Sequence, residues 1–232
     1  SDLAAFAQND SAGIPAPVLA ALVHVRLAGI HPFADGNGRT ARVLASLAMD
    51  RGGYTRPQFT SLEEWWGAHR GDYYDAFGCL GTSWRDDADV TPFIAVHVRA
   101  QRLQVDALSL KEAAERALWG VLEDLVTEDL GMQPRVADAL YDGFFGRAVT
   151  NRYYRALADV SVATAANDLA RLDASGLLAA QGAGRSRSYS GSAALVASVA
   201  HAAQLGDPPT GSPLEGQRKW VLTRLAERVS GA

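Results

Sequence analysis

The chain has 232 residues, of which 48% are hydrophobic and 21% charged, and its formal net charge is −4. This composition is typical of a globular protein with one large domain or two smaller ones, and it excludes a disordered chain. No apolar stretch approaches the length that spans a membrane, and no signal peptide is visible. A single cysteine, Cys79, excludes an internal disulfide framework. We therefore expect a cytoplasmic protein without membrane partners.

The charge is unevenly distributed along the chain. Residues 1–132 hold 11 lysines and arginines against 18 acidic residues, whereas residues 133–190 hold 7 against 5. Non-specific affinity for nucleic acid comes largely from neutralising phosphates. Nucleic-acid contact is therefore not expected for the acidic part and is left open for the later segment.

Two helices are predicted before the first informative motif. One covers about Asp2–Gln8 and is followed by a loop over residues 9–13. The next opens at Pro17, because proline fits the first helical position, and its apolar residues have helical spacing. We interpret His24 on this helix as a packed core histidine, since nothing nearby suggests a metal partner.

The twelve residues His31–Arg42 combine a base, a carboxylate, two glycines and two arginines in one stretch. Gly36 and Gly38 allow positive φ angles and a close approach of the backbone to a ligand. The apolar spacing after Arg39 is helical. The loop therefore ends at a helix N-terminus, where unpaired N–H groups and the positive end of the helix dipole form an anion site.

The charged residues of this stretch fit phosphate chemistry. A carboxylate such as Asp35 beside phosphates is a usual way to hold Mg²⁺. Arg39 and Arg42 are three residues apart, so they share a helix face and are suited to grip the outer phosphates of a nucleotide. His31 precedes the loop, and histidine accepts a proton near neutral pH.

This stretch resembles the motif of the Fic family, His-Pro-Phe-x-Asp/Glu-Gly-Asn-Gly-Arg-x-x-Arg, at every specified position. The usual reaction of that family is transfer of AMP from ATP to a hydroxyl of a target protein. The resemblance implies that His31 deprotonates the hydroxyl, that Asp35 holds Mg²⁺, and that the amides of Gly36, Asn37 and Gly38 form an anion hole.

The resemblance also assigns the phosphates. Asn37 would orient the α-phosphate, while Arg39 and Arg42 would bind the β- and γ-phosphates. Pro32 and Phe33 are expected to be structural, with Phe33 buried beneath the turn.

Beyond the motif, the chain reads as helical almost to Leu130. The motif helix should stop at Gly52-Gly53, and residues 61–77 have helical spacing with many aromatic rings. In Fic domains one tyrosine of an adjacent pair helps to form the wall of the adenine site. The pair here is Tyr73-Tyr74, and the resemblance implies that Tyr74 contacts the adenine and that Tyr73 is a packing residue. Gly81 stands where relatives often have asparagine, so base specificity stays open.

Residues 92–130 form the next predicted helical stretch. Ser109 and Glu112 have capping-box spacing. This leaves open whether one helix ends near Leu108 or continues. The turn formers Gly131 and Pro134 then suggest a domain boundary.

Residues 133–190 predict three helices, near residues 136–141, 151–158 and 161–175, followed by a hairpin with a glycine turn. This order resembles a winged helix-turn-helix, which follows the Fic core in some family members. Arg185 and Arg187 on the wing are candidates for phosphate contacts. Such modules also dock proteins or dimerise, so DNA contact and a homodimer both stay open.

Two family features have no match in the sequence. An inhibitory helix of the pattern Ser/Thr-x-x-x-Glu-Gly/Asn does not occur, and no β-hairpin flap is evident before the motif. Because the chain starts with Ser1 rather than Met, we expect that the N-terminal part of the core is truncated and that both features lie upstream.

The sequence therefore predicts a mostly α protein. A Fic-type helical core covers residues 1–131, a winged helix-turn-helix with a small β-hairpin covers 133–190, and a helical tail covers 191–232. The predicted function is a protein adenylyltransferase that moves AMP from MgATP to a Ser, Thr or Tyr hydroxyl and releases pyrophosphate. Two alternatives remain: a DNA-binding regulator with a silent or nucleotide-sensing site, and a transferase of UMP, phosphocholine or a similar group.

Overall fold

The computed structural model describes residues 3–8, 13–81, 85 and 87–231. The chain divides into two compact units, Ser1–Ser109 and Leu110–Ala232. Both are mainly helical, and a small antiparallel sheet lies in the second unit. Among the described residues, no helix combines the length and apolar character that crossing a bilayer requires.

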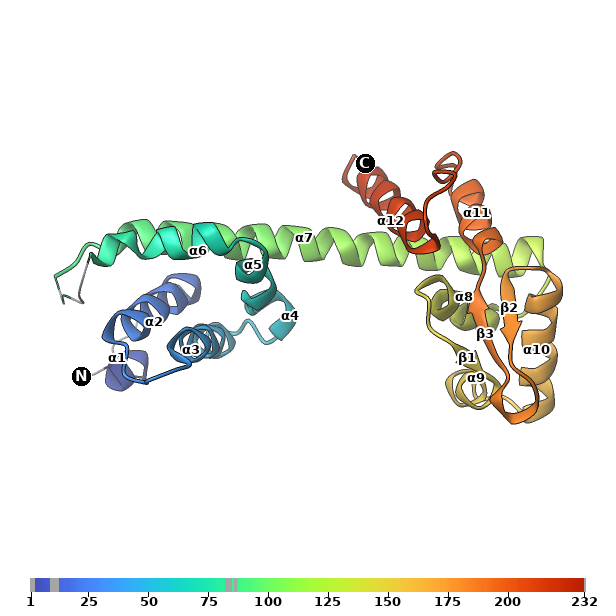
Figure 1. Ribbon diagram of the computed structural model, residues 1–232, viewed down its shortest axis with the longest axis horizontal. Helices are drawn as coiled ribbons and strands as arrows, with labels where there is room; N and C mark the ends of the chain where they lie inside the picture. The colour runs from blue at the N-terminus through green and yellow to red at the C-terminus, as the bar shows by residue number, and fades with distance from the viewer. Residues whose placement is uncertain (1–2, 9–12, 82–84, 86, 232) are drawn as a thin grey trace. The chain divides into compact units, whose positions relative to one another are not determined.

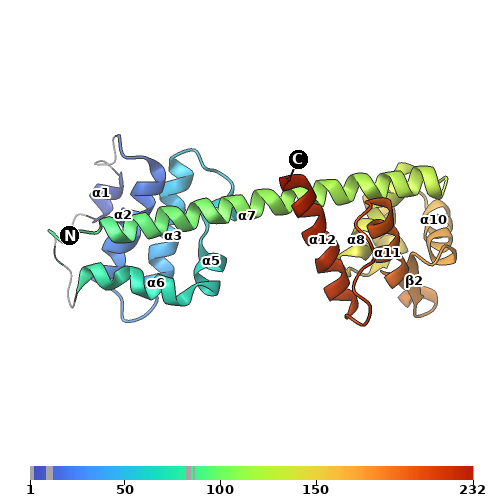
Figure 2. The same cartoon turned by 90° about the horizontal axis from the view of Figure 1, so that it is seen from above.

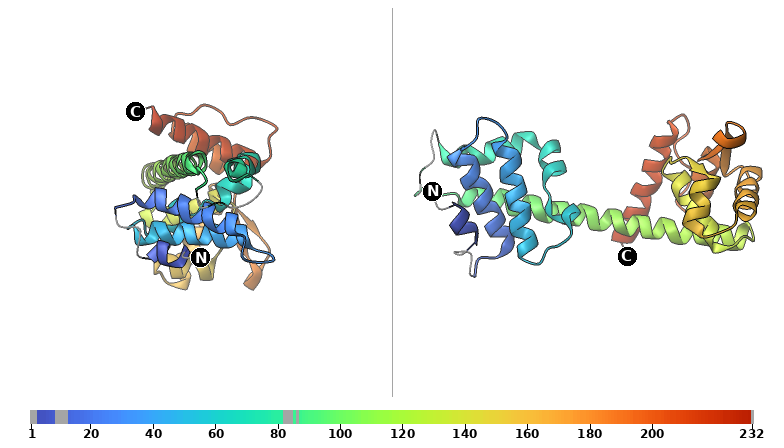
Figure 3. Two further views of the ribbon diagram at one scale, coloured as in Figure 1. Left: turned by 90° about the vertical axis from the view of Figure 1, so that its left-hand side faces the viewer. Right: turned by 90° about the horizontal axis from the view of Figure 1, so that it is seen from below.

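The first unit is built around two long helices, α2 and α3, which lie side by side (Figure 1, Figure 3). Leu19 and Val23 of α2 pack against Ala45 and Met49 of α3. Small side chains allow the two backbones to approach closely. The helical elements of this unit are α1 (Leu3–Gln8), α2 (Ala16–Ile30), α3 (Asn37–Arg51), α4 (Pro57–Thr60), α5 (Glu63–Ala68), α6 (Arg70–Ala76), the 3₁₀ turn η1 (Phe77–Leu80) and the first part of α7 (Thr91–Asp124).

The first part of α7 crosses α2 and is flanked by α6 (Figure 2). Phe93 of α7 is fully buried and packs with Ala21 and Val25 of α2. Further along, Ala100 packs with Trp66 and with Tyr73. These contacts close the apolar core of the first unit beneath the motif.

The helix predicted over residues 61–77 is interrupted. His69 has φ −119° and ψ 49° and separates α5 from α6. Its ring Nδ1 donates to the carbonyl of Trp65 at 2.9 Å, and its ring stacks on that of Trp65. The side chain thereby competes with the regular helix ladder, which periodicity alone does not reveal.

The second unit joins helices to a three-stranded sheet of order β1-β3-β2. Both pairings are antiparallel, with Ala180 opposite Tyr189 and Val149 opposite the same tyrosine. The elements are the end of α7, a π-helical turn η2 (Leu125–Asp129), η3 (Pro134–Val136), α8 (Ala137–Phe144), β1 (Val149–Thr150), α9 (Asn151–Ala158), α10 (Val162–Ala174), β2 (Leu178–Gln181), η4 (Gly184–Ser186), β3 (Ser188–Gly191), α11 (Ala193–Ala202) and α12 (Leu214–Ser230).

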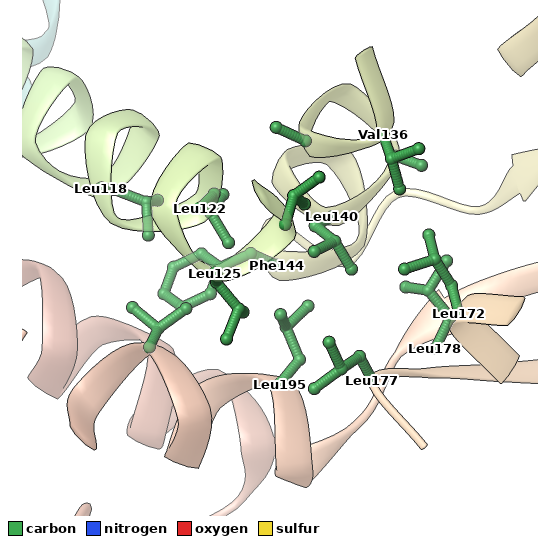
Figure 4. Close-up of a cluster of buried hydrophobic side chains, with 14 of the residues drawn as sticks. Leu118, Leu122, Leu125, Val136, Leu140, Phe144, Leu172, Leu177, Leu178 and Leu195 are labelled. Atoms are coloured by element: carbon green, nitrogen blue, oxygen red, sulfur yellow. The ribbon is translucent and has the colours of Figure 1, made fainter. Parts of the chain in front are cut away.

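Local signals fix where the later helices begin. Thr150, Ser161 and Ser192 each accept a hydrogen bond from a backbone N–H in the first turn of α9, α10 and α11, respectively. Such caps satisfy donors that the helix leaves unpaired. Between these helices, leucines of α7, Phe144 of α8 and Leu195 of α11 meet in one buried cluster (Figure 4).

Most predicted elements are present in the structure. The helix after the first loop, the motif helix, the three helices of residues 133–190 and the hairpin appear within a few residues of their predicted positions, and the tail is helical. The tail helix α12 packs through Val221 and Leu225 on the second unit. Asp2 and residues 9–12 of the predicted first loop lie outside the described residues.

The structure decides one point that the sequence left open and adds two details that the sequence did not predict. The chain is one continuous helix through Ser109 and Glu112, so the capping-box spacing there marks no helix end. The two compact units divide within this helix rather than at Gly131. The two-residue strand β1 was not expected, because it is too short to show alternation.

Removing the ring of Phe144 should destabilise the second unit. Its side chain is fully buried, and a Phe→Ala change in a core costs about 3–5 kcal/mol. We expect Phe144→Ala to accelerate amide hydrogen exchange in peptides from residues 133–191 and not in peptides from residues 16–51. Leu157→Ala, at an exposed position of α9, is the matched control and should change neither set. Unaltered exchange in Phe144→Ala would contradict this packing.

Candidate active site

The loop between α2 and α3 begins with a histidine in a strained backbone conformation. His31 caps α2 with φ 52° and ψ 53°, in the left-handed region that few non-glycine residues adopt. Its ring Nδ1 lies 3.2 Å from the carbonyl oxygen of Ala28. Because a carbonyl only accepts, Nδ1 carries the proton in this contact. In the neutral tautomer that this contact favours, Nε2 is the acceptor nitrogen, and the residue is exposed.

The N-terminus of α3 lies where the sequence predicts an anion site. Gly36 is the N-cap, with φ 86°, a conformation that favours glycine. Its own N–H donates to Oδ1 of Asp35 at 2.7 Å. The next amides, those of Asn37 and Gly38, lie in the first turn of a 15-residue helix, where no intrahelical acceptor exists for them. They are available to an anion.

The side chain of Asn37 holds the loop in shape. It is buried, its Oδ1 accepts from the N–H of Phe33 at 2.9 Å, and its Nδ2 donates to the carbonyl of Phe33 at 2.6 Å. Each end of the amide therefore has one partner in the loop, and the backbone N–H of Asn37 remains for a phosphate.

Two sequence expectations in the loop are wrong. Phe33 is 49% exposed rather than buried beneath the turn; its backbone is fixed by Asn37, so the ring is not needed to hold the loop. Gly38 does not have a positive φ. A Cβ there would lie 3.3 Å from Nη1 of Arg42 and 3.4 Å from the hydroxyl of Tyr73, so this glycine makes room for those side chains.

Asp35 and Arg39 form an exposed ion pair at the mouth of the site. Oδ2 of Asp35 lies 3.2 Å from Nη2 of Arg39, and the two side chains are 92% and 72% exposed. Such a pair is weak in water, so each side chain is free to turn to a ligand. No group of three or more His, Cys, Asp or Glu side chains among the described residues is placed to hold a metal. One carboxylate beside phosphates nevertheless fits Mg²⁺, which keeps waters and shares its other positions with a substrate.

Arg42 is held much more firmly than Arg39. Its side chain is 18% exposed, and its Nε lies 2.7 Å from Oε1 of Glu63 at the start of α5, an ion pair rather than a well-aligned hydrogen bond. Its Nη1 donates to the hydroxyl of Tyr73 at 3.4 Å. Burial works to lower the pKa of Arg42, and the contact with the Glu63 carboxylate outweighs it and raises that pKa. Arg42 is thus a fixed, permanent cation.

A buried polar row continues inward from Arg42. Since the Tyr73 hydroxyl accepts from Arg42, its proton is available to Nε2 of His24, 3.3 Å away. The His24 ring meets the His97 ring edge to face at 5.2 Å. Burial lowers the pKa of His97 to about 4, and burial followed by the neighbouring His97 and Arg42 lowers that of His24. Both rings are therefore neutral at pH 7.

These supporting residues were not identified from the sequence. His24 is a buried core histidine, as predicted, but its contact with Tyr73 was not foreseen. Tyr73 was interpreted as packing only, and Glu63 as part of an aromatic helix. The adjacent Tyr73-Tyr74 pair was the one available signal, whereas nothing local marks Glu63, which lies 21 positions after Arg42.

All eight sequence-predicted site residues come together around one cleft of about 580 Å³. Tyr73 and Gly81 also line it, and Tyr74 is 69% exposed at its edge. His31, the helix N-terminus and the two arginines therefore line the same space. The predicted residues that line the cleft are His31, Asp35, Gly36, Asn37, Gly38, Arg39, Arg42 and Tyr74.

Residues 2–49 match the model of the Fic/DOC family. The Fic/DOC match therefore covers α2, the loop and most of α3, which carry His31 and the amides of Asn37 and Gly38. It stops before Glu63, Tyr73 and Tyr74, which complete the cleft.

Curated proteins are similar to parts of the chain. Protein adenylyltransferase Fic of Nematostella vectensis is 36% identical over 88 residues, which are 38% of this chain and 18% of that protein. Protein adenylyltransferase fic-1 of Caenorhabditis elegans is 57% identical over 75 residues, 32% of this chain and 13% of its own length. The corresponding protein of Caenorhabditis briggsae is 42% identical over 119 residues, 50% of this chain and 21% of its own length. The chain thus spans about a fifth or less of these relatives.

The buried histidines should make the chain sensitive to acid. The unfolded imidazole has a pKa near 6.5, whereas that of His97 is about 4 in the folded protein. The folded state then binds fewer protons, so stability present above pH 6.5 is lost as the pH falls towards 4, by about 3 kcal/mol from His97 alone. We expect the calorimetric melting temperature to fall over this range.

The variant His97→Leu tests the origin of this slope. It removes the titrating ring and keeps an apolar side chain in the core, so the fall in melting temperature between pH 6.5 and 4 should become shallower. An unchanged slope of melting temperature against pH would show that groups other than His97 cause the acid sensitivity.

Proposed function

We propose that this chain is the nucleotide-transferring part of a protein adenylyltransferase. The observation that carries the proposal is that Nε2 of His31, the amide N-terminus of α3 and the fixed guanidinium of Arg42 face one cleft. In this reaction the hydroxyl oxygen of a target protein attacks the α-phosphorus of ATP. The bond from the α-phosphorus to the bridging oxygen breaks, and pyrophosphate leaves with the bonding electrons.

His31 takes the proton from the attacking hydroxyl. Its Nδ1–H is engaged by the Ala28 carbonyl, which fixes the tautomer and orients Nε2 as acceptor. General-base catalysis of this kind contributes roughly 10²- to 10⁴-fold. The left-handed backbone at His31 is strain retained at a functional position.

The phosphates bind along the start of α3. The backbone amides of Asn37 and Gly38 hold the oxygens of the α-phosphate, on which negative charge must be stabilised as the new bond forms. Arg42 and Arg39 bind the β- and γ-phosphates. Glu63 and Tyr73 hold Arg42 in place, whereas the exposed side chain of Arg39 is free to move. Donors that are fixed before the reaction need no reorganisation during it.

Asp35 is the residue that would hold Mg²⁺, with the nucleotide's phosphates supplying further oxygens. The ion would neutralise charge on the phosphates and on the departing pyrophosphate. Binding it requires Asp35 to release Arg39, which the weak exposed pair permits. Tyr74 and Gly81, at the edge of the cleft, would then contact the adenine.

We further propose that residues 137–191 form a winged-helix module. The order α8, β1, α9, α10, β2, β3 and the antiparallel β2-β3 hairpin support this assignment. The charges do not favour DNA as its ligand. Arg135, Arg147 and Arg187 each form an ion pair with an aspartate, at 3.1, 2.8 and 3.4 Å, which reduces the positive charge available to DNA phosphates. The side chain of Arg185 lies outside what the structure describes.

Labelled ATP tests the reaction. With Mg²⁺ and a cell lysate, ATP labelled on the α-phosphate should label a protein, while ATP labelled on the γ-phosphate should not. His31→Ala should abolish the labelling and leave ATP affinity nearly unchanged, since it removes the base and no phosphate contact. Label from the γ-phosphate would indicate phosphoryl transfer instead, and full labelling by His31→Ala would refute the role of His31.

Arg42→Ala should weaken ATP binding. Hydrogen bonds to a charged partner contribute about 1.5–3 kcal/mol, so we expect the Kd for MgATP to rise roughly 10- to 100-fold and that for AMP to change little. Arg51→Ala, at the other end of the same helix, is the matched control.

In Arg42→Ala the carboxylate of Glu63 loses its partner, and its charge would repel the phosphates. The double variant Arg42→Ala/Glu63→Gln removes this repulsion, so it measures the lost attraction of Arg42 alone. If Arg42→Ala binds MgATP as tightly as the wild type in calorimetry, Arg42 does not contact the outer phosphates.

A further inference from the structure

A second cavity of about 540 Å³ lies in the first unit, between the end of α3, residues 53–60 and α7. It shares no lining residue with the cleft that contains His31. Ligand sites in proteins commonly have volumes of roughly 300–1,000 Å³. The cavity is therefore a separate site of suitable size.

The walls of this cavity are predominantly apolar. Met49 comes from α3, Phe59 from α4, and Val98 and Val105 from α7. Arg102 also lines it, but its charge is offset by Asp106, 3.8 Å away on the same helix. Such a surface suits the faces of a planar ring.

A buried polar side chain without a hydrogen-bond partner among the described residues interrupts this apolar lining. Gln101 of α7 lines the cavity and is 5% exposed, and neither its Oε1 nor its Nε2 has a hydrogen-bond partner among the described residues. Nearly all buried polar groups in proteins are paired, so each exception requires an explanation. Gln104, three residues further along α7, donates from its amide to the carbonyl of Ser61 at 3.2 Å, so glutamines on this face can be satisfied.

We propose that this cavity binds a small planar molecule whose edge pairs with the amide of Gln101. A carboxamide presents a donor and an acceptor side by side in one plane. Its complement is an edge with an acceptor and a donor in the same arrangement, as in an aromatic carboxamide, a lactam or a nucleobase. The ring of the ligand packs between the apolar walls.

The chain provides its own reporter for this site. It contains two methionines: Met49 lines the cavity, and Met132 lies in the core of the second unit. With ¹³C-labelled methionine methyl groups, the full chain should give two NMR signals, which Met132→Leu assigns. Benzamide is the probe, and acetophenone, which has nearly the same shape but a methyl group in place of the amide nitrogen, is the matched control.

Benzamide should shift the Met49 signal saturably and leave Met132 unchanged. Acetophenone should bind at least about five-fold more weakly, because it leaves the Gln101 acceptor unpaired. In Gln101→Leu the advantage of benzamide over acetophenone should disappear.

Two results would overturn the proposal. One is the lack of any saturable Met49 shift with benzamide. The other is equal binding of benzamide and acetophenone to the wild-type chain, which would show an unspecific apolar hole. The comparison of benzamide with acetophenone on the wild-type chain needs no variant, so it tests the proposal even if Gln101→Leu does not fold.

Discussion

The candidate site depends on the hydrogen bonds between the Asn37 side chain and the backbone of Phe33. They tie the loop back onto the first turn of α3, at 2.9 and 2.6 Å. His31 then ends α2 and Gly36 begins α3, both with a positive φ. As a result the base and the free amides lie at opposite ends of a short, rigid loop. A buried amide that is hydrogen-bonded at both ends favours one loop geometry.

A second constraint is the support of Arg42 by Glu63 and Tyr73. Arg42 would be mobile on an exposed helix face, but Glu63 and Tyr73 hold it, and Tyr73 is tied in turn to a buried neutral histidine. Taking polar groups such as His24 and His97 out of water is costly without full compensation. We interpret the buried row of Tyr73, His24 and His97 as a feature that lowers the folding stability but keeps the guanidinium of Arg42 in place. The exposed Arg39 has no such support and is free to follow its ligand.

The sequence was informative where function depends on neighbouring residues. The twelve-residue motif predicted the loop, the helix N-terminus and every residue that lines the cleft from α3, and Gly52-Gly53 predicted the end of that helix. It failed where contacts join distant residues: Glu63 and Tyr73 reach Arg42 from 21 and 31 positions away, with no periodic signal. Phe33 was wrongly predicted to be buried because hydrophobicity does not show that Asn37 already holds the turn. The break at His69 depends on one ring nitrogen.

The orientation of a bound nucleotide tests the proposed chemistry most directly. A crystal structure of the chain with Mg²⁺ and an ATP analogue that carries a methylene group between the α- and β-phosphates would reveal it. We expect the α-phosphate at the amides of Asn37 and Gly38, the outer phosphates at Arg39 and Arg42, and Nε2 of His31 on the side opposite the methylene group. A γ-phosphate nearest to His31, or a nucleotide bound outside the cleft, would contradict AMP transfer by this site.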